Sequence, residues 1–291
     1  MFRITQRSMA DTTYANLQSS LGRSQQLQAQ LSSGKQVGRP SDSPIGASDI
    51  MQLRGERAAT DQYVRNAENG LSWLTSSDSA LQQSSEALRR ARELTVQGGS
   101  TSLSQAGRDA IALELVGIRD SLVELANTQY LGRPVFGGTT AGPVAFAPDG
   151  SYVGDGGSVE RRVGADSSVR VDVDGAAAFG TGATSVFATL DAVVADLRAG
   201  SPSGPHLGRI DASAERISGM LSDVGARTNR IDALKLKADD TAITLRSAQS
   251  QIEDIDLPKA ILELQMQTVA YQAALGATGK VLQPTLLDFL R

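Results

Sequence analysis

Few side chains in the sequence have the types and spacing that catalysis or metal binding requires. The 291 residues include no cysteine and one histidine, His206. Without cysteine there can be no disulfide, thiolate metal site, iron–sulfur cluster or cysteine nucleophile. One histidine also excludes any metal site that needs two imidazoles. No base or orienting group accompanies His206, so we expect a solvated histidine in a loop between two helices.

Two short motifs resemble ligand-binding loops, and each lacks a residue that the ligand needs. Asp172-Val173-Asp174-Gly175 resembles part of a calcium loop, but Arg170 and Thr181 would fill the first and twelfth ligand positions. We predict a turn there. Residues 180–185 resemble half of a phosphate-binding loop without its lysine, so we predict that Thr184 or Ser185 caps the next helix. We therefore predict no catalytic residue, no metal and no cofactor, and a protein that is not an enzyme.

Charge and hydropathy argue against nucleic acid and membrane as partners. The chain carries 28 basic and 32 acidic residues, a net charge of −4, and only 4% aromatic residues. Arg161-Arg162 could contact nucleic acid, but aromatic side chains are not interleaved with the charges. No apolar run approaches the ~20 residues that cross a bilayer, and the N-terminus lacks the regions of a signal peptide. We expect no export by the general secretory route.

The composition favours long, closely packed helices with one glycine-rich insert. Apolar residues make up 40% of the chain, and much of that share is alanine rather than aromatic. Residues 132–185 hold 12 of the 29 glycines, together with short strand-like runs. We predict a small antiparallel β module there, inserted between helical flanks. Within it, Asp149-Gly150 is expected to form a two-residue hairpin turn with φ > 0 at both positions.

The flanks repeat apolar residues every seven positions, as in coiled coils and long bundles. One seam of this kind runs through Ile210, Ile217, Val224, Ile231, Ala238, Leu245 and Ile252. The seam changes phase near the C-terminus, where Asp256 is a predicted N-cap and Pro258 fits a first helical turn. It resumes at Ile261, Leu264, Thr268, Tyr271, Leu275, Thr278 and Leu282. We predict that one helix ends and another begins between the two seams.

The N-terminal segment is predicted to be a polar helix that pairs with the last one. The apolar residues of 1–33 have helical spacing, but few of them are large. Gly34 is expected to end this helix. Ser43-Pro44 offers the cap and first turn of the next helix. Residues 1–40 carry five basic residues and one acidic, whereas residues 251–291 carry five acidic and three basic. The two ends are therefore complementary in charge.

These patterns predict a mainly α fold with a small inserted antiparallel β module and a long helical bundle or coiled coil formed by both chain ends. Residues 1–43 and 251–291 would form a paired-helix polymerisation domain. Residues 44–131 and 186–250 would form a helical bundle, and 132–185 the β module at the outer tip. Apolar stripes left over on the end helices favour a ring or tubular homo-oligomer. The predicted contacts with other subunits are Leu17, Leu21, Leu27, Leu31, Ile261, Leu264, Tyr271, Leu275, Leu282, Leu286, Leu287 and Leu290.

Several motifs resemble the flagellin superfamily. On the N-terminal side they are Leu31-Ser32-Ser33-Gly34-Lys35, Asp42-Ser43-Pro44, Asn66, Asn69-Gly70 and Ala91-Arg92-Glu93-Leu94; on the C-terminal side they are 225–231 and 253–256. Asn127-Thr128, Val135-Phe136-Gly137-Gly138, 152–155 and the ending 286–290 resemble the hook–filament junction branch of that superfamily. One departure is Ser43, where the family often has a second Asp. The motif residues are Gly34, Asp42, Pro44, Asn127, Phe136, Gly137, Gly138, Arg227 and Asn229.

The resemblance implies an extracellular structural subunit of the bacterial flagellum. Such proteins form a ring between the proximal hook-associated protein and the flagellin filament, after export through the flagellar type III apparatus. Their terminal segments are disordered before assembly and become paired helices in the polymer. A cytosolic export chaperone would hold the C-terminal helix. The partners implied are further copies of the chain, flagellin, the proximal hook-associated protein and that chaperone, with no nucleic acid and no membrane.

Three other functions remain open from the sequence. A minor flagellin, copolymerised along the filament, would share the architecture. An enzyme or binding module would need a site in the β insert, for which the sequence offers no constellation. A cytosolic coiled-coil regulator would stay inside the cell.

Overall fold

The chain folds mainly into helices. The computed structural model describes residues 2–100 and 102–281. The helices are α1 (Phe2–Ser33), α2 (Pro44–Gly98), α3 (Gln105–Ala126), α4 (Gly175–Phe179), α5 (Val186–Ala199), α6 (Leu207–Glu253) and α7 (Leu257–Val281), with 3-10 turns η1 (Gly182–Thr184) and η2 (Gly204–His206). The strands are β1 (Gln129–Tyr130), β2 (Arg133–Pro134), β3 (Glu160–Gly164) and β4 (Ser167–Arg170). They pair as two antiparallel two-stranded sheets, β1–β2 and β3–β4. The predicted fold class is confirmed.

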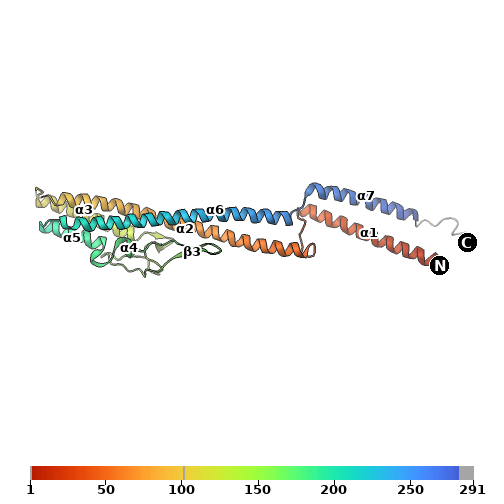
Figure 1. The fold of residues 1–291 in the computed structure, drawn as a ribbon, viewed down its shortest axis with the longest axis horizontal. Coiled ribbons are helices and arrows are strands. Elements are labelled where there is room, and N and C mark those ends of the chain that lie inside the picture. Colours follow the sequence, from red (N-terminus) through yellow and green to blue (C-terminus); the bar gives the residue numbers. More distant parts are fainter. Residues whose placement is uncertain (1, 101, 282–291) are drawn as a thin grey trace. The chain divides into compact units, whose positions relative to one another are not determined.

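The chain divides into two compact units. One contains Met1–Ala58 and Ala242–Arg291, and the other contains Ala59–Thr241. The long helices α2 and α6 run through both units. In the first unit α1 and α7 lie side by side, and in the second α3 lies along α5 (Figure 1). None of the described helices is both long and apolar enough to cross a membrane.

The helix boundaries follow the capping signals of the sequence. Gly34 has φ of +71° and ends α1, a conformation that glycine adopts readily. Pro44 is the first residue of α2, and the hydroxyl of Ser43 accepts the Gly46 N–H at 3.1 Å. The carboxylate of Asp256 accepts the Lys259 N–H at 3.2 Å at the start of α7. These caps confirm the predicted breaks between the long helices.

The core of the second unit contains the first half of the predicted α6 seam. Ile210, Ile217, Val224 and Ile231 are fully buried. Asn69-Gly70 lies inside α2, as predicted, and the glycine has a packing reason. A Cβ at Gly70 would lie 3.2 Å from the Cδ1 atom of Ile231 and 3.1 Å from the Cγ1 atom of Val171. Gly70 thus lets α6 and the β module approach α2 closely.

Four phenylalanines join the β module to the helices. Phe136, Phe146, Phe179 and Phe187 come from the loop after β2, the loop before β3, α4 and α5, and all are buried. Phe146 lies 5.6 Å from Phe179 and 5.3 Å from Phe187 between ring centroids, in edge-to-face geometry. Although aromatic residues are sparse in the chain, most of its phenylalanines therefore gather at this one place.

The predicted turn at Asp149-Gly150 differs in the structure. Asp149 does not have a positive φ, and the Ala147 N–H donates to Ser151 O at 2.9 Å across a three-residue loop. The Asp149 carboxylate accepts the Ser151 N–H and hydroxyl, which holds Asp149 in an Asx turn. The two-residue turn with positive φ at both positions occurs instead at Leu131-Gly132, with φ of +51° and +77°.

The prediction of a solvated His206 is wrong. Its side chain is 15% exposed, and Nε2 lies 2.8 Å from Oδ2 of Asp196 on α5. The loop before it folds inward because the buried Ser203 hydroxyl donates to the Thr95 carbonyl at 3.0 Å. The capping role predicted for Ser185 is confirmed, since its hydroxyl accepts the Ala188 N–H at 3.0 Å. Asp174, in the predicted turn, caps the short helix α4.

Candidate assembly surface of the terminal helices

The terminal helices α1 and α7 form an antiparallel pair. At one end the Ile255 N–H donates to the Gly34 carbonyl at 3.0 Å, and farther along the side chain of Gln267 reaches Ser20. Residue numbers therefore run in opposite directions along the two helices. Pairing of the first and last helices, which the charges of the two ends predicted, is present in the folded chain (Figure 1).

The seam between the two helices repeats every four and three residues, as in a coiled coil. The less exposed positions that follow this spacing are Thr13, Leu17, Ser20, Ser24, Leu27 and Leu31 on α1 and Ala260, Leu264, Gln267, Tyr271, Ala274 and Thr278 on α7. Gln30 and Glu263, each next to one of these positions, are also partly buried. Of the twelve seam positions, Leu27 and Ala260 are fully buried. Seven of these twelve seam positions are Ser, Thr, Gln or Ala, so little apolar area leaves water when the helices pair. Such a pair gains little stability from its own seam.

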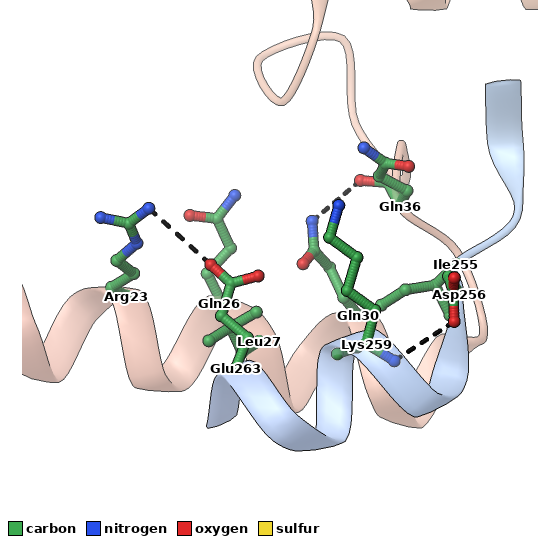
Figure 2. Close-up of a pocket in the computed structure, with 10 residues that line it drawn as sticks. Arg23, Gln26, Leu27, Gln30, Gln36, Ile255, Asp256, Lys259 and Glu263 are labelled. Carbon is green, nitrogen blue, oxygen red and sulfur yellow. Dashed lines mark hydrogen bonds and ion pairs between the residues drawn. The ribbon is translucent and has the colours of Figure 1, made fainter. Parts of the chain in front are cut away.

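Polar contacts supplement this seam. The Gln267 amide donates to the Ser20 hydroxyl at 2.8 Å and to the Ser20 carbonyl at 3.2 Å. Arg23 and Glu263 lie 3.8 Å apart, and both side chains are largely in water, where an ion pair contributes little. Figure 2 shows these two residues at one end of an open groove of about 330 Å³, whose other lining includes Leu27 and Ala260. The groove is mostly polar.

A buried carboxylate joins the segment that follows α1 to the segment that precedes α7. The side chain of Glu253, at the end of α6, is 4% exposed. Its Oε1 atom accepts from Lys35 Nζ at 2.5 Å and from an Arg54 guanidinium nitrogen at 2.7 Å, and its Oε2 accepts from Gln249 at 2.6 Å. The hydrogen bonds from Lys35 and Gln249 lower the pKa of Glu253 to about 2, against the effect of burial. We call Glu253, Lys35, Arg54 and Gln249 the clasp.

Backbone hydrogen bonds reinforce the clasp. The Glu253 carbonyl accepts the Gln36 N–H at 2.7 Å. The backbones of Lys35 and Asp254 also pair as an isolated antiparallel β-bridge. The α1–α2 connection is thereby fixed to the α6–α7 connection. Within that connection the Asp42 carboxylate accepts the N–H groups of Gly38 and Arg39 at 3.1 and 2.9 Å. Asp42 thus organises the loop that carries Lys35 into the clasp.

The clasp predicts a specific pH dependence. The pKa of Glu253 lies below its ordinary value of 4.5 in the folded chain, so the stabilisation is complete above about pH 5 and is lost as the pH falls toward 2. We expect up to about 3 kcal/mol from this group. Urea unfolding between pH 6 and 3 should show a steeper loss of stability for the native chain than for Glu253→Gln. Parallel curves for the two proteins would contradict this role.

Apolar side chains remain uncovered on the opposite face of α7. Leu262, Met266 and Val269 are 58%, 58% and 65% exposed, and Ala273 and Gly276 continue their four-and-three spacing. We call these five residues the outer stripe. Because the spacing matches the seam but is shifted by two positions, the outer stripe lies on the side of α7 away from α1. Exposed apolar patches of this length are typical of surfaces that another chain covers.

The residues predicted to contact other subunits fall into three groups. Leu27 is buried against α7, and Leu17, Leu31, Leu264 and Tyr271 are half-buried in the seam. Leu21, Ile261 and Leu275 are exposed. Leu282, Leu286, Leu287 and Leu290 lie outside the described residues. Contacts of any of them with another subunit stay a prediction.

Asn127 links α3 to the β module because its side-chain amide forms hydrogen bonds with backbone groups of the module. Its Oδ1 accepts the N–H groups of Ala145 and Phe146 at 2.8 and 2.9 Å, and its Nδ2 donates to the Phe146 carbonyl at 2.9 Å. Asn127→Ala leaves these buried backbone groups unpaired, so we expect a loss of about 2–3 kcal/mol. Chemical denaturation measures it, with the exposed Asn229→Ala as the control, expected within about 0.5 kcal/mol. Equal effects of the two substitutions would refute the role of Asn127.

The other motif residues hold the β module in place. Phe136 belongs to the phenylalanine cluster, and Gly137 packs against Pro134. Gly138 has φ of +69° and no room for a side chain. Arg227 on α6 donates to the Asp172 carbonyl at 2.8 Å.

Some important residues escaped prediction. The buried carboxylate of Asp172 accepts two hydrogen bonds from Arg170, at 3.0 and 2.7 Å, and one from the Val159 N–H. Arg54 was not singled out either. Glu253 belongs to the 253–256 motif, but no partner for its carboxylate was predicted. Within residues 2–100 and 102–281, no three His, Asp or Glu side chains gather closely enough to hold a metal ion.

Comparison with known proteins identifies the family. The model of the bacterial flagellin N-terminal helical region matches residues 4–141, and that of the C-terminal helical region matches residues 207–290. The two matched ranges cover α1 from residue 4 onward and the whole of α2, α3, α6 and α7. The chain belongs to the bacterial flagellin family.

Individual members of the flagellin family align over most of this chain. Flagellar hook-associated protein 3 of Escherichia coli is 28% identical over 275 residues, covering 85% of this chain and 87% of that protein. Flagellin of Bacillus subtilis is 25% identical over 290 residues, covering 94% and 93%. The crystal structure of Bacillus cereus FlgL superposes with a TM-score of 0.60 at 25% identity, covering 68% of this chain and 99% of that one. These relatives support a structural role in the flagellum, and the predicted resemblance is confirmed.

Proposed function

We propose that the chain is a structural adaptor of the bacterial flagellum that forms the junction ring between the hook and the flagellin filament. The observation that carries this proposal is the outer stripe of α7, which stays in water in a single copy. The seam to α1 is too polar to hold the pair firmly by itself, so neighbouring copies complete it. The relatives named hook-associated protein 3 favour the junction over other flagellar positions.

In this proposal each part of the chain has its own contacts. Residues 1–43 and 251–291 polymerise, residues 44–131 and 186–250 form lateral contacts, and residues 132–185 face outward. The ring joins the proximal hook-associated protein on one side and flagellin on the other. Before assembly the chain passes through the flagellar type III apparatus, and a cytosolic chaperone holds the C-terminal helix. Covering the outer stripe at that stage prevents premature association.

A gene deletion tests the junction role. A strain without this protein is expected to keep its hooks and to release flagellin into the medium, because the junction ring on which the filament assembles is missing. Immunoblots of the medium and electron microscopy of the cells measure both effects, and re-expression of the intact chain is the control. Full-length filaments on the deleted strain would overturn the proposal.

The second candidate function is a minor flagellin, which the likeness to flagellin over 94% of the chain favours. Immunogold labelling separates the two. A junction protein gives one spot beside the hook, whereas a minor flagellin labels the filament along its length.

A further inference from the structure

Leu131 occupies a backbone position that a leucine rarely adopts. Among the described residues it alone combines a side chain with positive φ, at +51°. It is the first residue of the two-residue turn between β1 and β2, where Asn, Asp or Gly is favoured. Leu131 is 79% exposed, the highest value among the large apolar residues whose exposure the structure describes. Backbone preference and solvent thus both disfavour leucine here, which is typical of positions kept for a function.

The base of this turn is fixed to the helical core. Tyr130 packs edge-on against Trp73 with the ring centroids 5.7 Å apart, and Asn69 donates to its hydroxyl at 3.4 Å. Pro134, on the other strand, is buried. The turn therefore holds Leu131 as a rigid apolar knob, and little conformational freedom is lost when a partner binds it.

The same unit contains a groove that could receive a leucine side chain. It measures about 320 Å³. It lies between α2, the β3–β4 connection and α6. Its apolar lining includes Tyr63, Val163, Leu234 and Ala238, and its charged residues are Asp166 and Lys237.

We propose that Leu131 of one copy inserts into this groove of a neighbouring copy, with Arg133 beside Asp166. Arg133 follows the knob by two residues and is exposed, as is Asp166 on the β3–β4 connection. The charges therefore complement each other when the knob enters from the Asp166 side. Because knob and groove are different surfaces, the contact repeats from copy to copy and builds a ring or a helical array. This inference rests on the proposed function and names one of its lateral contacts.

Leu131→Asn separates a binding role from a folding role. Asparagine accepts positive φ, so the variant should unfold at the same or a higher temperature than the native chain. It removes the apolar knob, so we expect at least tenfold fewer filaments per cell in the complemented deletion strain. The control is Leu113→Asn, which changes a similarly exposed leucine on α3 and should leave filament number unchanged. Native filament numbers with Leu131→Asn would overturn the contact.

Cysteine crosslinking tests the partner, and the native chain has no cysteine to interfere. Leu131→Cys and Ala165→Cys are expressed together in the deletion strain and oxidised in isolated hook–filament complexes. We expect disulfide-linked pairs of the two variants, and oligomers beyond the dimer when one chain carries both substitutions. Leu131→Cys with Leu113→Cys is the control pair and should stay monomeric.

Two results would overturn the contact. One is crosslinking of Leu131→Cys mainly to itself, and the other is the same yield with the control pair. Either result, in a system where the deletion strain lacks filaments and the intact chain restores them, would refute the contact of Leu131 with the groove. The proposed junction role would not be affected by it. Filaments on the deleted strain itself would remove the junction role instead.

Discussion

Val269→Asp is expected to abolish filament attachment without unfolding the monomer. The side chain of Val269 is 65% exposed at the centre of the outer stripe, so an aspartate there is well solvated in a single copy. In the assembled ring the same carboxylate would be taken out of water against apolar side chains, which costs several kcal/mol. Each 1.4 kcal/mol is a factor of ten in affinity. We expect at least tenfold fewer filaments per cell, measured by electron microscopy of the complemented deletion strain.

The matched control for this substitution is Ala270→Asp, which adds the same charge at the neighbouring residue. Ala270 is also exposed on α7, and it belongs neither to the seam nor to the outer stripe. Far-UV circular dichroism and gel filtration of both monomers should match the native chain. Equal loss of filaments with Ala270→Asp would mean that charge anywhere on α7 blocks assembly, and the outer stripe would lose its special role.

The terminal helices show why apolar spacing alone misplaces a seam. The sequence predicts Ile261 and Leu275 in the seam, yet both are exposed. The less exposed positions of α7 include Ala260, Gln267 and Ala274, which the spacing of large apolar residues does not indicate. A pair held by small and polar residues gives a weak periodic signal. Leu262, Met266 and Val269 of α7 are strongly apolar and stay exposed in the single chain. In α6 the opposite holds, because Ile217 and Ile231 are large, apolar and fully buried within one chain.

Contacts between distant residues could not be predicted from one sequence. Lys35 and Glu253 are 218 positions apart, and the two motifs that contain them carry no sign that their side chains pair. The caps at Gly34, Ser43 and Asp256 were predictable because each acts on a backbone group within four residues. The turn at Asp149-Gly150 failed for a local reason, since the aspartate accepts hydrogen bonds from Ser151 instead of adopting positive φ. His206 failed because Asp196, its partner, is fixed by the tertiary fold.

Gly138→Ala is expected to destabilise the second unit by at least about 3 kcal/mol, lowering its melting temperature by roughly 6–12 °C. Two effects combine there. Gly138 has φ of +69°, which a side chain disfavours. A Cβ atom would also lie 2.4 Å from Oδ1 of Asp155 and 2.7 Å from the backbone nitrogen of Gly157. Asp155 cannot move freely, because it accepts hydrogen bonds from Thr139 and Gly157 that also lower its pKa.

Gly132→Ala separates the two effects. Gly132 has φ of +77°, but a Cβ there would meet no atom within 4 Å. Only the backbone preference is lost, so we expect a loss of about 1 kcal/mol. Thermal unfolding followed by circular dichroism compares the two variants with the native chain. The difference between them measures the steric part at Gly138, about 2 kcal/mol or more. Equal melting temperatures would show that Asp155 and Gly157 yield to a methyl group, and that the close packing around Gly138 does not hold the β module.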